Sequence, residues 1–156
     1  MYSNKLVCDI IKYIDSNIEN KISIEDLENK CFYNRYYIMK LFKKEMDITI
    51  VDYINSLRIY NSITQIRDTN NSLLNIAFRN GFNSIEYFSE IFKKIVGVNP
   101  QIIRKYFKNK NSVSLVHINT INNSILNLYN LIQFKNNYLL HEKPDIIPVK
   151  KLSIFR

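Results

Sequence analysis

The stretch Asn80-Gly-Phe-Asn-Ser-Ile-Glu-Tyr-Phe-Ser-Glu-Ile-Phe-Lys-Lys-Ile-Val-Gly-Val-Asn-Pro100 decides the fold of this 156-residue chain. Ser84 is a helix N-cap residue, and Gly81 and Gly97 on either side supply the positive φ that tight turns need. Asn99-Pro100 marks the start of another helix. Between the glycines, apolar residues recur with helical spacing: Tyr87, Phe88, Ile91, Phe92 and Ile95. The stretch predicts turn, helix, exit and new helix.

An earlier copy of this pattern precedes the stretch. Phe92-Lys-Lys94 repeats Phe42-Lys-Lys44 at an offset of 50, and Ser72-Leu-Leu-Asn-Ile76 echoes Ser23-Ile-Glu-Asp-Leu27 at an offset of 49. The second copy therefore has one extra residue in its turn. Each copy reads as a short helix, a tight turn and a longer helix, which is the pattern of a helix-turn-helix.

Helical periodicity continues outside the copies. Ser23 with Asp26 is a variant of the capping box, and Thr49 with Asp52 repeats it at the start of a long helix. That helix continues to about Asp68 and is roughly 27 to 30 Å long. Two inward stripes are expected, one in the helix after Asn34 and one in the long helix: Tyr37, Ile38, Leu41, Phe42 and Met46, then Val51, Tyr53, Ile54, Leu57, Ile59, Ile63 and Ile66.

These patterns predict an all-α, homeodomain-like architecture over residues 1–107. Two helix-turn-helix subdomains, about 22–47 and 72–97, are joined by a linker helix at about 49–68 and followed by a last helix at about 100–107. Two glycines and three prolines argue against a many-turned β fold and against Gly-rich phosphate loops. Successive major grooves of DNA lie about 34 Å apart, so two such heads in one chain could read both without dimerising.

Residues 108–156 lie outside the repeat and predict a small appendage of uncertain α/β structure and unknown role. The β-branched run 113–118 fits a short strand, 121–134 fits a helix, and 146–155 fits an edge strand. The helix would face inward with Ile125, Leu128, Leu131 and Ile132. Two roles stay open for this segment: packing on the domain, or docking on a partner such as polymerase or a second copy.

The formal net charge is +8, from 22 basic and 14 acidic residues, which favours a nucleic acid or an anionic membrane surface. Counted by region, the net charge is +3 over 1–107 and +5 over 108–156. Between Lys30 and Lys44 there are five basic residues and no acid. No stretch reads as a secretory signal or membrane span. Cys8 and Cys31 suggest two buried thiols in a reducing, cytoplasmic protein without metal or cofactor.

The repeated pattern resembles the AraC/XylS family of bacterial transcription regulators, especially its small two-headed members. The second copy carries most of the resemblance, in Gly81-Phe82, Tyr87-Phe88, Phe92-Lys93, Gly97, Pro100 and Arg104. The first copy fits through 22–27, Tyr36-Tyr37 and 41–44, and the linker fits through Tyr53-Ile54 and Arg58. The resemblance covers about residues 5–107.

This resemblance implies a sequence-specific DNA-binding transcription regulator, with activation as the usual outcome, and not an enzyme. Double-stranded DNA is the implied partner of a monomer, with RNA polymerase as a second partner and a dimer through 108–156 left open. The recognition helices are about 34–46 and 84–96. Their implied base-reading residues are Tyr36, Met39, Lys40, Glu86, Ser89 and Glu90, and the implied phosphate contacts are Arg35, Lys43, Lys44, Ser84, Lys93 and Lys94.

Departures from the family pattern leave two questions open. Phe32 and Asp47 stand where glycine is common, so the first turn either sits differently or gains an aromatic plug, and Glu28 replaces a common alanine. Glu90 replaces a common donor, so the second recognition helix either enters a groove or rests on the backbone. The alternative function is a protein-interaction or decoy module with the same fold that has lost specific DNA binding.

Overall fold

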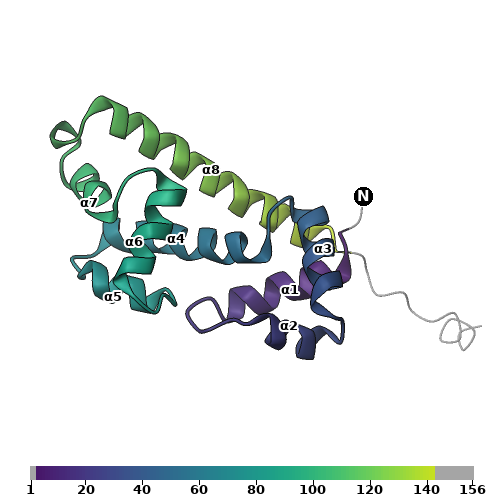
Figure 1. The fold of residues 1–156 in the computed structure, drawn as a ribbon. Helices are drawn as coiled ribbons and strands as arrows, with labels where there is room; N and C mark the ends of the chain where they lie inside the picture. The colour runs from purple at the N-terminus through teal and green to yellow at the C-terminus, as the bar shows by residue number, and fades with distance from the viewer. Residues whose placement is uncertain (1–2, 143–156) are drawn as a thin grey trace, which may run out of the picture.

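The computed structural model describes residues 3–142, and over this range the chain is helical, as the sequence predicts (Figure 1). The pattern is confirmed in both copies, each with a short and a longer helix. The elements, in chain order, are α1 (Lys5–Ser16), α2 (Ile24–Cys31), α3 (Arg35–Met46), α4 (Ile50–Asp68), α5 (Leu73–Arg79), α6 (Ile85–Val96), α7 (Pro100–Lys108), the 3-10 turn η1 (Lys110–Ser112) and α8 (Leu115–Leu140).

Side-chain caps set the helix starts that the sequence predicts. Ser23 and Asp26 form the full capping box of α2, and Thr49 accepts from the Asp52 N–H at the start of α4. Asn34 and Ser84 cap the longer helix of each copy in the same way, by accepting from the N–H three residues on. The two copies therefore begin their helices by one mechanism.

Two hydrophobic cores form, and α4 contributes to both. Its first half packs Ile54 and Leu57 with α1, α2 and α3, while its second half packs Ile59 and Ile63 with α5, α6 and α7. Figure 1 shows α4 running through the middle of the molecule, with the first copy at one end and the second copy at the other.

The expected strand at 113–118 is wrong. Ser114 caps a helix by accepting from the His117 N–H, and α8 then continues without a break through Leu140. The β propensity of residues 113–118 is overridden, because the helical conformation buries Ile121 and Leu128 in the second core. The strand expected at 146–155 lies outside the described residues, in which the one β pairing is the isolated bridge between Ser3 and Glu142.

Helix α8 is part of both cores and not an appendage to one of them. Ile121 and Leu128 lie in the second core, and Leu131 and Ile132 pack against the first, as their expected inward orientation requires. In Figure 1 this helix crosses the molecule from α7 to α3. Of the two roles considered for this segment, packing is therefore present in the structure.

Several residues expected inside lie at the surface. Phe32 is 91% exposed, so the aromatic plug is wrong. Tyr37 and Val51 are exposed too, Tyr37 because its ring stacks at 5.1 Å on the ring of Tyr33 instead of entering the core. Cys8 is buried as expected, and burial raises the pKa of its thiol to about 11, whereas Cys31 is only half-buried.

The two copies have different residues at the helix ends where the backbone adopts a positive φ. At matching helix ends the second copy has Gly81 (φ +80°) and Gly97 (φ +84°), where the first has Phe32 (φ +60°) and Asp47 (φ +57°). A side chain with a Cβ in this left-handed region costs roughly 1 to 2 kcal/mol. The first copy therefore carries backbone strain that the second avoids.

We expect Phe32→Gly to raise the free energy of unfolding by about 1 kcal/mol, because it relieves this strain and sacrifices almost no burial. Urea unfolding followed by circular dichroism measures the change. Tyr33→Gly is the matched control, since it also removes an aromatic ring but outside the left-handed region and with loss of the Tyr37 stack, so it should destabilise. Equal losses of stability in both variants would contradict the strain assignment.

Candidate nucleic-acid interface

One face of α3 presents the three residues that the sequence places on it. Tyr36 is 80% exposed, and Met39 and Lys40 are exposed beside it. Their spacing of three and four residues puts them on one side of the helix. Ile38 and Phe42 face the opposite way and are fully buried, so the core fixes the direction in which this exposed face points.

The lysines of α3 differ in what they contact. Lys43 donates to the backbone carbonyl of Asp47 at 2.8 Å, with the Asp47 carboxylate 3.9 Å away, which stabilises the C-terminal end of the helix. Lys40 and Lys44 are exposed and form no ion pair with any residue in 3–142. These two ammonium groups are the ones available to an external anion.

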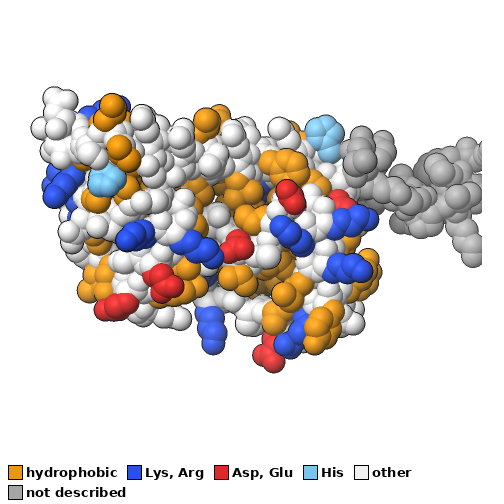
Figure 2. Space-filling model, turned by 45° about the horizontal axis from the view of Figure 1, so that its top comes forward, with side chains coloured by type: hydrophobic (Ala, Val, Ile, Leu, Met, Phe, Trp, Pro, Cys, Tyr) orange, Lys and Arg blue, Asp and Glu red, His pale blue; other side chains and the backbone are white. Residues whose placement is uncertain are grey.

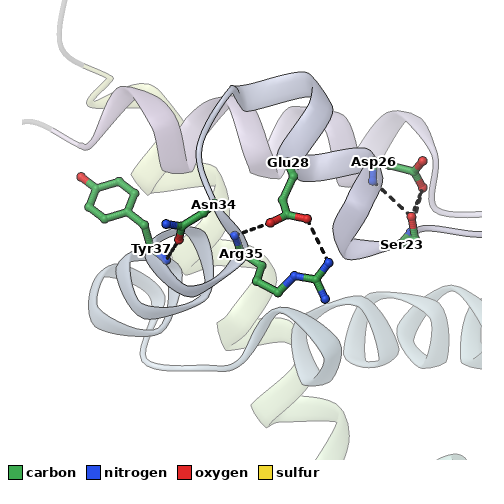
Figure 3. Close-up of polar contacts among 6 residues, drawn as sticks. All are labelled: Ser23, Asp26, Glu28, Asn34, Arg35 and Tyr37. Carbon is green, nitrogen blue, oxygen red and sulfur yellow. Dashed lines mark hydrogen bonds and ion pairs between the residues drawn. The ribbon is translucent and has the colours of Figure 1, made fainter.

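Glu28 holds the start of α3 (Figure 3). Its carboxylate accepts from the Arg35 backbone N–H at 2.6 Å and from the Arg35 guanidinium at 3.1 Å. The first turn of α3 has no acid of its own, so Glu28, from the preceding helix, meets the positive end of the helix dipole. These hydrogen bonds hold the pKa of Glu28 below its ordinary value and raise the pKa of Arg35.

This contact bears on the phosphate contact expected of Arg35. The expected phosphate contact is engaged inside the protein, with its guanidinium turned back toward α2, as Figure 3 shows. Sequence reasoning noted Glu28 only as a replacement for alanine and missed the pair. The spacing of seven residues across a turn gave no helical periodicity that could have signalled it.

The outward face of α6 is mixed in charge. Glu86 and Glu90 are exposed, and Ser89 between them is half-buried. Glu86 has a structural reason to be there, because an acid in the first turn complements the helix dipole. Lys93 is exposed, Lys94 lies 3.8 Å from the Asp52 carboxylate on α4, and the Ser84 hydroxyl accepts from the Tyr87 N–H at 3.1 Å.

No continuous basic face appears in the view of Figure 2, where Lys and Arg side chains alternate with Asp and Glu. The upper part of that view is largely uncharged. On the face in view, cations and acids are therefore mixed, and within α3 it is Lys40 and Lys44 that form no ion pair with a described residue.

Arg58 connects the two copies across the linker helix α4. Its guanidinium donates to the carbonyls of Ile18 at 2.9 Å and Asn20 at 2.6 Å, and its centre lies 5.9 Å from the ring centroid of Phe82. Burial lowers the pKa of Arg58 from its ordinary value. A Cβ at Gly81 would lie 2.8 Å from this guanidinium, so glycine there serves close approach as well as positive φ.

Within residues 3–142, no helix is both long and apolar enough to cross a membrane. No group of three or more metal-ligating side chains gathers in this range.

Fold and surface together define a protein with two helix-turn-helix heads on one chain. A family model described as a helix-turn-helix domain matches residues 27–106. The chain belongs to the AraC/XylS family, and with it to the DNA-binding transcription regulators.

Sequence relatives support the same assignment. The chain is 35% identical over 104 residues to the putative transcriptional regulator YkgA of Escherichia coli, covering 67% of this chain and 44% of that protein. It is 29% identical over 104 residues to the TetD protein of transposon Tn10 from the same species, covering 67% and 75%. The chain thus spans less than half of YkgA and three quarters of TetD.

Solved structures share the fold. A protein of unknown function from Listeria innocua superposes with a TM-score of 0.62 at 29% identity, covering 65% of this chain and 97% of that one. The DNA-binding domain of AdpA, solved in complex with a target DNA, gives a TM-score of 0.64 at 14% identity, covering 71% and 100%. The second likeness concerns the fold alone.

We expect the Glu28–Arg35 contact to give a pH-dependent part of the stability. Because the pKa of Glu28 is lower in the folded than in the unfolded chain, its contribution is present above the unfolded value and is lost as pH falls through the folded value. Urea unfolding from pH 6 to pH 3 should show wild type more stable than Glu28→Gln at pH 6, with the difference shrinking steadily as the pH falls below the unfolded value.

Glu19→Gln is the control, because it removes an exposed carboxylate that caps no helix. This variant should track wild type across the range. A stability difference for Glu28→Gln that stays constant with pH would show that the carboxylate charge is not what holds α3.

Proposed function

We propose that this protein is a sequence-specific transcription activator that reads one major groove with α3 and places α6 at the next groove. The observation that carries the proposal is the exposed face of Tyr36, Met39 and Lys40, whose ammonium has no partner in the described residues. A cation left unpaired on a rigid helix can exchange water for a nucleic-acid acceptor without first breaking an ion pair.

The chemistry of this face suits base edges. Lys40 can donate to guanine O6 and N7, while Tyr36 and Met39 offer apolar surface to thymine methyl groups. Lys44, one turn further on, is suited to a phosphate, which positions the helix but reads no sequence. Lys43 can serve the same role only if it leaves its contact with the Asp47 carbonyl.

The second head is proposed mainly to position the protein on the DNA backbone, and to read little sequence. Lys93 is free for a phosphate contact, Lys94 becomes so when it leaves Asp52, and the Ser84 hydroxyl can donate to a phosphate while it caps α6. Glu86 and Glu90 repel phosphates unless each accepts from a cytosine N4 amino group. In the fold relative AdpA, the DNA-binding domain is described with a target DNA, which supports duplex DNA as the partner.

The proposed role as an activator is supported by the names of two sequence relatives. AarP of Providencia stuartii, named a transcriptional activator, is 24% identical over 103 residues, and AdaA of Bacillus subtilis, named a bifunctional activator and repair enzyme, is 33% identical over 99. Contact with RNA polymerase is the proposed route. The acids of α6 favour a second candidate, a decoy module that keeps the fold without specific DNA binding.

We expect Lys40→Ala to lose about 5-fold to 150-fold in affinity for a duplex selected from random sequences, and almost nothing for a scrambled duplex, because it reads a base. Lys44→Ala is the matched control. This variant should weaken both duplexes alike and reduce the salt slope by about 0.9, because it contacts a phosphate. Gel-shift titration at several salt concentrations measures both.

Equal behaviour of Lys40→Ala and wild type on the selected duplex would reject α3 as the reading helix. No measurable binding of any duplex at low salt would favour the decoy over the regulator.

We expect Glu90→Ala, and still more Glu90→Arg, to bind the selected duplex as tightly as wild type or more tightly, because each removes a carboxylate from the DNA-facing side of α6. Glu19→Ala, which removes an exposed carboxylate outside both heads, is the control and should have no effect. A selective loss of affinity in Glu90→Ala would mean instead that this carboxylate accepts from a base.

A further inference from the structure

Helix α8 contacts the C-terminal end of α6. Its Ser124 hydroxyl shares its hydrogen between the Val96 carbonyl and the Thr120 carbonyl of its own helix, each at 2.8 Å. Thr120 packs so closely on Gly97 that a Cβ added to this glycine would lie 2.5 Å from the threonine methyl carbon. In α7, the Tyr106 hydroxyl donates to the side-chain oxygen of Asn122 on α8 at 2.7 Å. These contacts fasten the first half of α8 to the second head.

The other half of α8 contacts the C-terminal end of α3. The Tyr138 hydroxyl donates to the Glu45 carboxylate at 2.8 Å and accepts from the Asn4 N–H at 2.9 Å. Lys135 lies 3.1 Å from the Asp15 carboxylate, and its side chain is only 14% exposed. Because the Lys135 side chain is largely shielded from water and Asp15 only partly exposed, this pair is held more firmly than a fully exposed ion pair.

Helix α8 is thus a rod that contacts the C-terminal end of both recognition helices, α3 and α6. Between Ser124 and Tyr138 the rod is uninterrupted α-helix, about 21 Å long. The linker α4 is a second rod between the heads, and long helices commonly curve gently instead of staying straight. Two rods fastened at both ends make a frame in which the heads cannot rotate independently.

Such a frame matters for DNA because the duplex is helical. Adding one base pair between two contacted regions moves the second by about 3.4 Å and rotates it by about 34° around the axis. A flexible pair of heads follows this change, whereas a rigid pair loses one head's contacts.

We propose that α8 is a brace that fixes the distance and angle between α3 and α6, so that the protein selects operators with one spacing between their two contacted regions. This specificity would come from Ser124, Lys135 and Tyr138, none of which belongs to either DNA-facing surface. The proposal rests on the proposed function, since it requires that both heads meet one duplex.

The test uses the full chain and the selected duplex, with derivatives that have one base pair added or removed between the regions protected in a hydroxyl-radical footprint. Wild type should bind the altered duplexes about 10-fold or more weakly. The double variant Tyr138→Phe/Lys135→Ala keeps the packed ring of Tyr138 but loses the polar fastening to α3 and α1. It should lose less than about 3-fold on the altered duplexes and bind the original nearly as wild type.

Two further variants make the result specific to the brace. Asn127→Ala, at an exposed position of α8 away from both heads, should behave as wild type. Lys135→Asp should relax the spacing preference, and the swap Lys135→Asp with Asp15→Lys should restore it, because the ion pair is re-formed with reversed polarity.

Each outcome decides between the ideas. Equal spacing preference in wild type and in a double variant that circular dichroism shows to be folded overturns the brace and leaves the proposed function standing. A footprint with a single protected region overturns the brace as well, because only one head then meets DNA. Failure of wild type to select any duplex defeats the proposed function itself and the brace with it.

Discussion

Neither helix-turn-helix of this protein buries enough apolar surface by itself, and the sharing of two long helices between the heads follows from that constraint. Small units hide a smaller part of their surface on folding, so each head needs side chains from outside its own repeat. Helix α4 supplies Leu57 to one core and Ile59 to the other, and α8 supplies Leu131 and Leu128 in the same way. Stability of the two heads is therefore coupled, because loss of one core exposes part of the helices that complete the other.

The two copies have diverged in charge and in backbone strain together. The first accepts left-handed conformations at Phe32 and Asp47 and presents Lys40 and Lys44 without partners, while the second uses glycine at the matching turns and presents Glu86 and Glu90. Strain at Phe32 is not offset by burial, since its ring is almost fully exposed. The first copy has thus given up stability in the turn that leads into the helix proposed to read DNA, which is where strain tends to be kept for function.

The sequence predicted the helices well because each start has a local signal. Ser23, Thr49 and Ser84 each cap within three residues, and glycines mark the turns of the second copy. Contacts across longer separations were not predictable. The Glu28–Arg35 pair joins two helices across a turn, and Tyr138 reaches Glu45 from 93 residues away. The false strand at 113–118 has a related cause, since burial of Ile121 and Leu128 in the second core, together with the Ser114 cap, makes this β-branched run helical.

The positive charge of the C-terminal region is partly used in contacts within the protein. Of the three lysines in the described part of that region, Lys135 is paired with Asp15 and the Lys110 ammonium lies 5.1 Å from the ring centroid of Tyr106, so these two serve contacts inside the protein, while Lys108 is exposed. Helix α8 carries no other formal charge between Leu115 and Leu140. Apart from the paired Lys135, α8 lies against both heads without the cost of burying charge, and it leaves the electrostatic field at the proposed DNA-binding surface to α3 and α6.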